Sequence, residues 1–382
     1  MQAHASKKAI IIGGGIGGVT AAIALKQAGL DVTVYEQAEE LREVGSGLPL
    51  WTNALRTLHV LGLTDELEKL GVQVTSVRVS TWRGNTLTDT SNDKHLKNLG
   101  TITIVVHRAE LLTLLLKTLG EDKVQLGTTC VGFTQDATGV TARFANGQEV
   151  RGDVLIGADG IHSITRAQLL GIIKPKYVGY TCWRGLAHTT RTGLETWAWG
   201  KGCQFGITPM SQDRAYWFVQ KYAPEGEEDK LGGRKNRILE MFHDWHDPIP
   251  AVIEATAETD ILRNDIYELK HLHQWSHGRV TLLGDAAHAM TPNLGQGACQ
   301  AIEDAVALAD CLKDTTHISL ALKNYEKRRI VRTNRTTRLA HFIGQAVQWE
   351  NPILSVPRNI IIKKTPVSMA IKQFMWLLDY QP

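Results

Sequence analysis

The chain has 382 residues, of which 43% are hydrophobic and 21% charged, a composition typical of a globular protein with a large core. At ~100–200 residues per domain, this length predicts two or three domains. The 42 basic and 39 acidic residues nearly balance, which argues against nucleic acid as a partner, and no apolar stretch approaches the ~18 residues of a membrane-spanning helix.

The five cysteines are scattered, without a CxxC pair or a neighbouring histidine. This spacing predicts neither a zinc site nor a disulfide framework, so we expect no metal. Together with a polar N-terminal stretch that lacks a signal-peptide pattern, it favours the reducing cytoplasm. We expect a monomer or a homodimer without a membrane partner.

The N-terminal segment predicts a dinucleotide site. A β-branched strand at 9–12 is followed by a G-x-G-x-x-G spacing, made by Gly13, Gly15 and Gly18, that opens a helix. A second strand then ends at Glu36. Such glycines allow a tight turn and a close approach to a pyrophosphate, and an acid ~20 residues further on binds the ribose hydroxyls. This motif leaves FAD and NAD both open, while the acid disfavours NADP.

Beyond Glu36 the chain does not repeat strand–helix units as a nicotinamide domain would. The next predicted elements are a glycine-bearing loop at 43–48, helices at 54–61 and 64–70, strands at 76–82 and 102–106, an apolar helix from Arg108, short strands within 124–150 with a hairpin turn at Asn146-Gly147, and a buried strand that ends at Gly157-Ala158-Asp159-Gly160.

Residues 177–218 are short, aromatic, strand-like pieces that predict an antiparallel sheet, with a helix near 237–246. In one strand the alternation places Tyr180, Cys182 and Arg184 on one face. This face is a candidate wall for an apolar or aromatic ligand. Arg184 would then hold an anionic or phenolic group, with a surface salt bridge as the alternative. For Tyr216 the alternatives are substrate contact and core packing.

A third motif occupies 282–297, where an apolar strand ends at Gly284-Asp285, breaks at Pro292 and enters a helix near Gly297. His288 within it is expected to be structural. Further on, the basic run at 323–338 predicts a solvated helix face, with phosphate attraction or an acidic membrane surface as alternatives. The tail after Asn351 mixes apolar residues with lysines, and we expect a helix packing back on the protein, the alternative being a membrane-surface anchor.

The three glycine-acid motifs, at 13–18, 157–160 and 284–297, together resemble the FAD-dependent aromatic hydroxylases, the class A flavoprotein monooxygenases of the p-hydroxybenzoate hydroxylase fold. They are similar to those of urate hydroxylases, zeaxanthin epoxidases and tetracycline-inactivating monooxygenases. The resemblance covers roughly residues 7–340. It implies an α/β fold with a Rossmann-like FAD-binding domain that starts βαβ, a smaller antiparallel-sheet substrate domain and a C-terminal helix.

This fold predicts a discontinuous FAD-binding domain at 1–73, 101–175 and 273–345. The substrate domain is expected at 74–100 and 176–272, and a C-terminal helical segment at 346–382. The two ends of the chain would thus form two halves of one FAD site.

The resemblance implies that adenosine lies at the N-terminal motif and the isoalloxazine ring at the third motif. Reduced flavin carries negative charge, which the amino end of a helix starting near Gly297 would stabilise. The residues assigned to FAD in this way are Gly13, Gly15, Gly17, Gly18, Glu36, Gln37, Arg42, Gly47, Arg108, Asp159, Asp285, Pro292, Gly295, Gln296, Gly297 and Ala298.

By the same resemblance, NADH or NADPH docks transiently and reduces FAD, O2 adds at C4a, and the hydroperoxyflavin hydroxylates a small aromatic or polycyclic apolar substrate. Gln204 falls where similar urate hydroxylases carry a substrate-binding arginine, which puts urate in doubt. Two alternatives remain: a flavin-dependent reductase or dehydrogenase on the same fold, and a non-catalytic flavin-binding ligand sensor.

Overall fold

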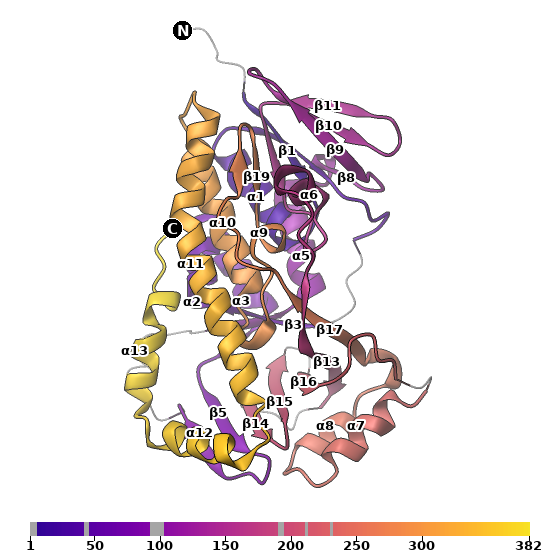
Figure 1. Cartoon of the computed structure of the whole chain (residues 1–382), viewed down its shortest axis with the longest axis vertical. Coiled ribbons are helices and arrows are strands. Elements are labelled where there is room, and N and C mark those ends of the chain that lie inside the picture. Colours follow the sequence, from indigo (N-terminus) through magenta and orange to yellow (C-terminus); the bar gives the residue numbers. More distant parts are fainter. Residues whose placement is uncertain (1–5, 42–45, 92–102, 190–194, 211–212, 230–231) are drawn as a thin grey trace.

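The computed structural model describes residues 6–41, 46–91, 103–189, 195–210, 213–229 and 232–382; Arg42, one of the predicted FAD ligands, lies outside them. Its upper half is built on a six-stranded sheet with the order β18-β19-β12-β1-β2-β8, parallel except for the β18–β19 pair (Figure 1). The strands are β1 (Lys8–Ile12), β2 (Asp31–Tyr35), β8 (Val124–Gln125), β12 (Val154–Gly157), β18 (Ser276–His277) and β19 (Val280–Leu282).

The register of this sheet brings the three glycine-acid motifs together. Ile12, at the end of β1, pairs with Tyr35 on one side and with Gly157 on the other, and Gly157 pairs in turn with Leu282. Because parallel strands end at the same sheet edge, the turns that follow these strands lie side by side. Segments about 270 residues apart in sequence therefore meet at one edge.

Both faces of the parallel sheet are covered, which explains its unbroken β-branched strands. One face packs against helices α1 (Ile16–Gln27), α5 (Arg108–Leu119) and α10 (Gly297–Leu312). The opposite face packs against a three-stranded antiparallel sheet made of β9 (Cys130–Gln135), β10 (Val140–Phe144) and β11 (Glu149–Gly152). The short helix α6 (Ile164–Leu170) follows β12.

The lower half of the molecule is a seven-stranded sheet with the order β17-β13-β16-β15-β14-β5-β6, in which only β14 and β5 run parallel (Figure 1). One of its faces packs Trp183, Phe205 and Trp217 against helices α7 (Arg234–Phe242) and α8 (Ile249–Glu254). The strands are β5 (Val77–Thr81), β6 (Thr86–Asp89), β13 (Lys176–His188), β14 (Glu195–Gly200), β15 (Cys203–Met210), β16 (Arg214–Tyr222) and β17 (Leu262–Glu268).

A small sheet joins the two halves. Its strands, in the order β3-β7-β4, are β3 (Gly47–Trp51), β7 (Thr103–His107) and β4 (Val72–Val74), with helices α2 (Thr52–Val60) and α3 (Thr64–Leu70) between β3 and β4. Val74 and Val105 of this sheet pack against Met210 and Tyr216 of the seven-stranded sheet. The strands of the two large sheets come from the chain segments that the sequence assigned to the FAD and substrate domains.

Helix α11 (Ile318–Val347) runs along the molecule and corrects one prediction. Most of the basic run at 323–338 is exposed as expected, but Arg329 is fully buried and pairs with Glu303 and Asp304 of α10. Arg332 also bonds to Glu303. The opposite charges on the two packed helices offset part of the desolvation cost that each would carry alone.

The C-terminal segment forms helices α12 (Pro352–Lys364) and α13 (Val367–Leu378). For α13 the expected packing is present, because Arg332 donates to the carbonyl oxygens of Trp376 and Leu377. Helix α12 also packs on the protein, against β6 and through Arg358, which is its one buried residue. Within the described part of the chain, no helix is both long enough and apolar enough to span a bilayer.

Candidate active site

The turn between β1 and α1 is tight enough to require glycine at two positions. Gly13 has φ +108°, and a Cβ there would lie 2.3 Å from the carbonyl oxygen of Ala158. A Cβ on Gly18 would lie 2.0 Å from the carbonyl oxygen of Gly13. Gly15 and Gly17 instead line a cavity of about 680 Å³, and a Cβ on Gly15 would meet no atom within 4 Å. The amino end of α1 is therefore open to a ligand.

Glu36 lies over this turn at the end of β2. One carboxylate oxygen accepts from the Gly14 N–H at 2.6 Å, and the other accepts from the Ala38 N–H at 2.9 Å. Gln37 beside it is exposed, and neither side chain is among those that line the cavity. The structure thus places Glu36 against the glycine turn, while its contact with a ribose remains a prediction.

In the second motif, Asp159 supports the loop. Its carboxylate accepts from the Ser163 hydroxyl at 2.6 Å, and from the Thr165 N–H and hydroxyl at 3.0 Å each, which holds the start of α6. Its neighbour Gly160 lines the cavity. Asp159 was predicted to contact FAD, but its carboxylate already accepts three hydrogen bonds within the protein and does not line the cavity.

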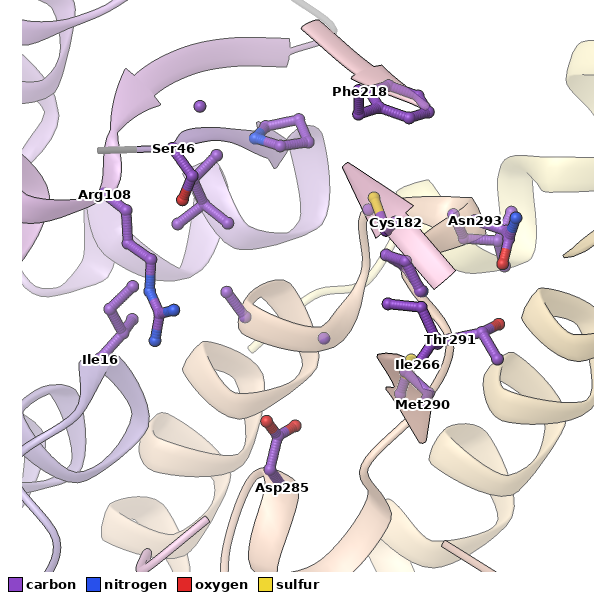
Figure 2. A pocket seen from close by; sticks show the side chains of 18 of the residues that line it. Ile16, Ser46, Arg108, Cys182, Phe218, Ile266, Asp285, Met290, Thr291 and Asn293 are labelled. Atoms are coloured by element: carbon purple, nitrogen blue, oxygen red, sulfur yellow. The ribbon is translucent and has the colours of Figure 1, made fainter. Parts of the chain in front are cut away.

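A buried arginine ties the second motif to the third. Arg166 donates to the carbonyl oxygen of Ile161 at 2.6 Å and to that of Ala286 at 3.0 Å. Ala286 belongs to the short helix α9 (Asp285–His288). This helix begins after Gly284, whose φ of +62° favours glycine. Asp285 points into the cavity from this turn (Figure 2).

His288 is structural rather than part of the cavity wall. Its Nε2 lies 2.6 Å from the Asp304 carboxylate, and the same carboxylate oxygen accepts from the Gly284 N–H at 3.1 Å. Both side chains are buried behind the loop. This pair fixes the turn that carries Asp285.

The amino end of α10 opens on the cavity. Gly295, in the turn that precedes the helix, has φ +60°. Four of the predicted residues here line the cavity: Pro292, Gly295, Gly297 and Ala298. Gln296 is buried and turns away, because its side-chain oxygen accepts from Asn53 at 3.1 Å. The helix therefore directs the positive end of its dipole toward a ligand in the cavity.

The small sheet carries Arg108 and Gly47 to the cavity wall. The Arg108 N–H donates to the Ser46 carbonyl oxygen at 3.0 Å, and the guanidinium reaches the space into which Asp285 points (Figure 2). A Cβ on Gly47 would lie 2.6 Å from the ring of Tyr216. Glycine at 47 thus allows the FAD-side loop to touch the sheet that forms the opposite wall.

The seven-stranded sheet forms that opposite wall. Cys182 and Arg184 line the cavity, whereas Trp183 between them packs into the core beneath α7 and α8. Two of the three residues that the alternation placed on this face thus line the cavity, whereas Tyr180 is buried and donates to the Asn293 side-chain oxygen at 2.6 Å. Arg184 also donates to Asn264 at 2.5 Å. The other lining residues from this sheet include Glu195, Trp197, Gln204, Thr208, Tyr216, Phe218 and Gln220.

Glu195 is a buried acid that the sequence analysis missed. Its Oε1 accepts from the Trp197 indole N–H at 3.1 Å and from the Thr208 hydroxyl at 3.3 Å. Burial raises the pKa of Glu195 to about 7, although both hydrogen bonds act to lower it. In the strand that starts at Glu195, alternation puts the acid on the same face as Trp197. This alternation was the signal in the sequence that could have identified Glu195 as a residue of the cavity wall.

The cavity contains polar groups without partners in the described part of the chain. These are the Gln204 Oε1, the Arg184 Nε, the Asp265 Oδ1, the Trp51 Nε1 and the Thr291 Oγ1. A buried polar atom without a hydrogen bond costs free energy, so these atoms are suited to a ligand. With the open glycine turns and the amino ends of α1 and α10, the lining residues fit the pyrophosphate and ring of a flavin dinucleotide.

Comparison with known proteins agrees with this geometry. Residues 6–340 match the family model described as FAD binding domain. The chain is 39% identical over 345 residues to an aurachin C monooxygenase/isomerase of Stigmatella aurantiaca, covering 90% of each chain. It is 36% identical over 334 residues to an FAD-dependent urate hydroxylase of Mycolicibacterium vanbaalenii, covering 85% of each. The crystal structure of Klebsiella pneumoniae HpxO complexed with FAD and uric acid superposes with a TM-score of 0.93, at 31% identity and covering 100% and 98% of the two chains.

The chain therefore belongs to the FAD binding domain family. Within that family it is a flavoprotein oxidoreductase of the FAD-dependent monooxygenase and hydroxylase group. This confirms the resemblance that the three motifs suggested, the α/β fold and FAD as the cofactor.

Proposed function

We propose that the protein is a single-component monooxygenase that uses NADH or NADPH and O2 to hydroxylate a small aromatic or polycyclic apolar substrate. The observation that carries this proposal is the continuity of one cavity, from the glycine turns of the parallel sheet to the aromatic wall of the antiparallel sheet. A cofactor and a substrate lying in it would be in direct contact.

FAD, when bound, supplies the redox chemistry: it accepts a hydride from the nicotinamide and activates O2. Gly15, Gly17 and Asp285 would hold its pyrophosphate and ribityl parts. The amino end of α10 would stabilise negative charge on the reduced ring. Trp197, Tyr216 and Phe218 would exclude water from the reacting atoms, which matters because water diverts the activated oxygen into hydrogen peroxide.

The polar groups of the wall suggest how a substrate is oriented. Arg184 and Glu195 lie on one sheet face, so a substrate with a donor and an acceptor group would be held between them and Gln204. Position 204 differs from the arginine of similar urate hydroxylases. The identity to an aurachin C monooxygenase/isomerase and the aromatic lining support a polycyclic substrate in preference to urate.

The test measures NADH and NADPH oxidation together with O2 uptake across a panel of aromatic and polycyclic compounds. Products are then analysed by mass spectrometry under isotopically labelled oxygen. We expect one compound to stimulate oxidation and to gain one labelled atom. Oxidation or reduction of a substrate without oxygen incorporation would favour a reductase or dehydrogenase. Binding without any stimulated turnover would favour a ligand sensor.

A further inference from the structure

Helix α12 presents aliphatic side chains to solvent. Ile353 is 78% exposed, Ile361 64% and Val356 52%. At 100° per residue, positions 353, 356, 360 and 361 share one side of a helix. The apolar face of α12 consists of Ile353, Leu354, Val356, Ile360 and Ile361, all more than 45% exposed.

The inward side of α12 is polar. Arg358 is its buried residue, and its Nη1 donates to the carbonyl oxygens of Ala346 at 2.7 Å and Val347 at 3.0 Å. The guanidinium carbon also lies 5.4 Å from the centre of the Trp199 ring. The helix is thus attached through Arg358 and the half-buried Ile362, while its other aliphatic side chains point outward. A contiguous exposed apolar face of this kind marks an interaction site.

The charge of the segment indicates what covers this face. Residues 352–378 contain Arg358, Lys363, Lys364 and Lys372 and no aspartate or glutamate. Lys363 and Lys364 are exposed at the end of α12. Apolar side chains next to lysines are the features that an anionic lipid surface attracts. A second copy of the chain would bring the same positive charge, with no acid in this segment to pair with it.

We propose that α12 docks the protein on an anionic lipid surface, with its apolar face in the boundary between headgroups and acyl chains and with Lys363 and Lys364 against the headgroups. Figure 1 shows α12 at the lower end of the molecule, where α11 ends. The proposal does not depend on the reaction that the cavity performs.

The experiment is co-sedimentation of the FAD-loaded protein with vesicles of phosphatidylcholine, alone or mixed with phosphatidylglycerol. We expect binding to the mixed vesicles that weakens as salt is added. Ile360→Asp with Ile361→Asp should weaken binding at least tenfold. Lys363→Ala with Lys364→Ala should weaken it roughly thirtyfold, from the attraction of two lysines near an anionic surface. All four side chains are exposed or half-exposed, so folding is unaffected and circular dichroism checks it.

The matched control is Val331→Asp with Ile172→Asp, which adds the same charge at two aliphatic positions that are 72% and 83% exposed outside the C-terminal segment. This variant should bind vesicles like the wild type. The proposal is overturned if mixed vesicles do not bind the wild type, or if the α12 and control variants bind equally. A dimer in light scattering that Ile360→Asp with Ile361→Asp dissociates would also overturn it, because the apolar face would then belong to a second copy.

Discussion

The raised pKa of the buried acid Glu195 leads to a prediction that requires no knowledge of the substrate. Its pKa of about 7, against an ordinary 4.5, means that the folded protein retains a proton that the unfolded chain releases. The contribution of Glu195 to the free energy of unfolding is therefore fully present below about pH 4.5 and is lost as the pH rises to about 7. At ~1.36 kcal/mol per pKa unit, this contribution to the free energy of unfolding is about 3 kcal/mol. Glu195→Gln keeps an oxygen for the Trp197 and Thr208 donors and cannot ionise, so it should escape this loss.

The assay is the thermal midpoint of the FAD-loaded wild type and variant between pH 4.5 and 8. With ~2.1 cal/mol/K of unfolding entropy per residue, about 3 kcal/mol corresponds to a relative gain of about 4 °C for the variant at the alkaline end. The exposed Glu240→Gln controls for the loss of a negative charge as such. A midpoint difference between Glu195→Gln and wild type that does not change with pH would refute the reasoning.

Three further predictions concern the cavity and its support. Asp285→Ala should weaken FAD binding roughly 5- to 150-fold, because flavin hydroxyls lose their acceptor, and fluorescence titration with FAD measures this; unchanged affinity would remove Asp285 from the site. Arg184→Ala should leave FAD bound while more of the oxidised NAD(P)H ends as hydrogen peroxide, and equal coupling in both proteins would contradict this. Arg329→Met should destabilise the fold by about 3–5 kcal/mol, since Glu303 and Asp304 would remain buried without their partner; a thermal midpoint like that of the wild type would exclude this role.

Features set by local chain geometry were predictable from the sequence. The spacing of Gly13 and Gly18 predicted the turn because Gly13 has a φ of +108° and a Cβ on Gly18 would collide with the Gly13 carbonyl oxygen in the same turn. The alternation around Cys182 and Arg184 predicted which residues share a face, although only the folded sheet shows that this face lines the cavity.

Features that depend on distant partners were not predictable. Arg329 stands in a basic run that resembles a solvated face, and its burial depends on carboxylates of the preceding helix. For α12, the sequence predicted a helix packing on the protein, but not that Arg358 would attach it through the carbonyl oxygens of Ala346 and Val347.

The register of the parallel sheet has a consequence for how the chain acquires its cofactor. Leu155 pairs with Val280, so the third glycine turn joins the other two only after the whole antiparallel sheet between them has been synthesised. Contacts this far apart in sequence form late in folding. A growing chain can order the β1 turn early, but it lacks Asp285 and the amino end of α10 until its last quarter emerges. Tight retention of FAD thus reports that both halves of the molecule have folded and met.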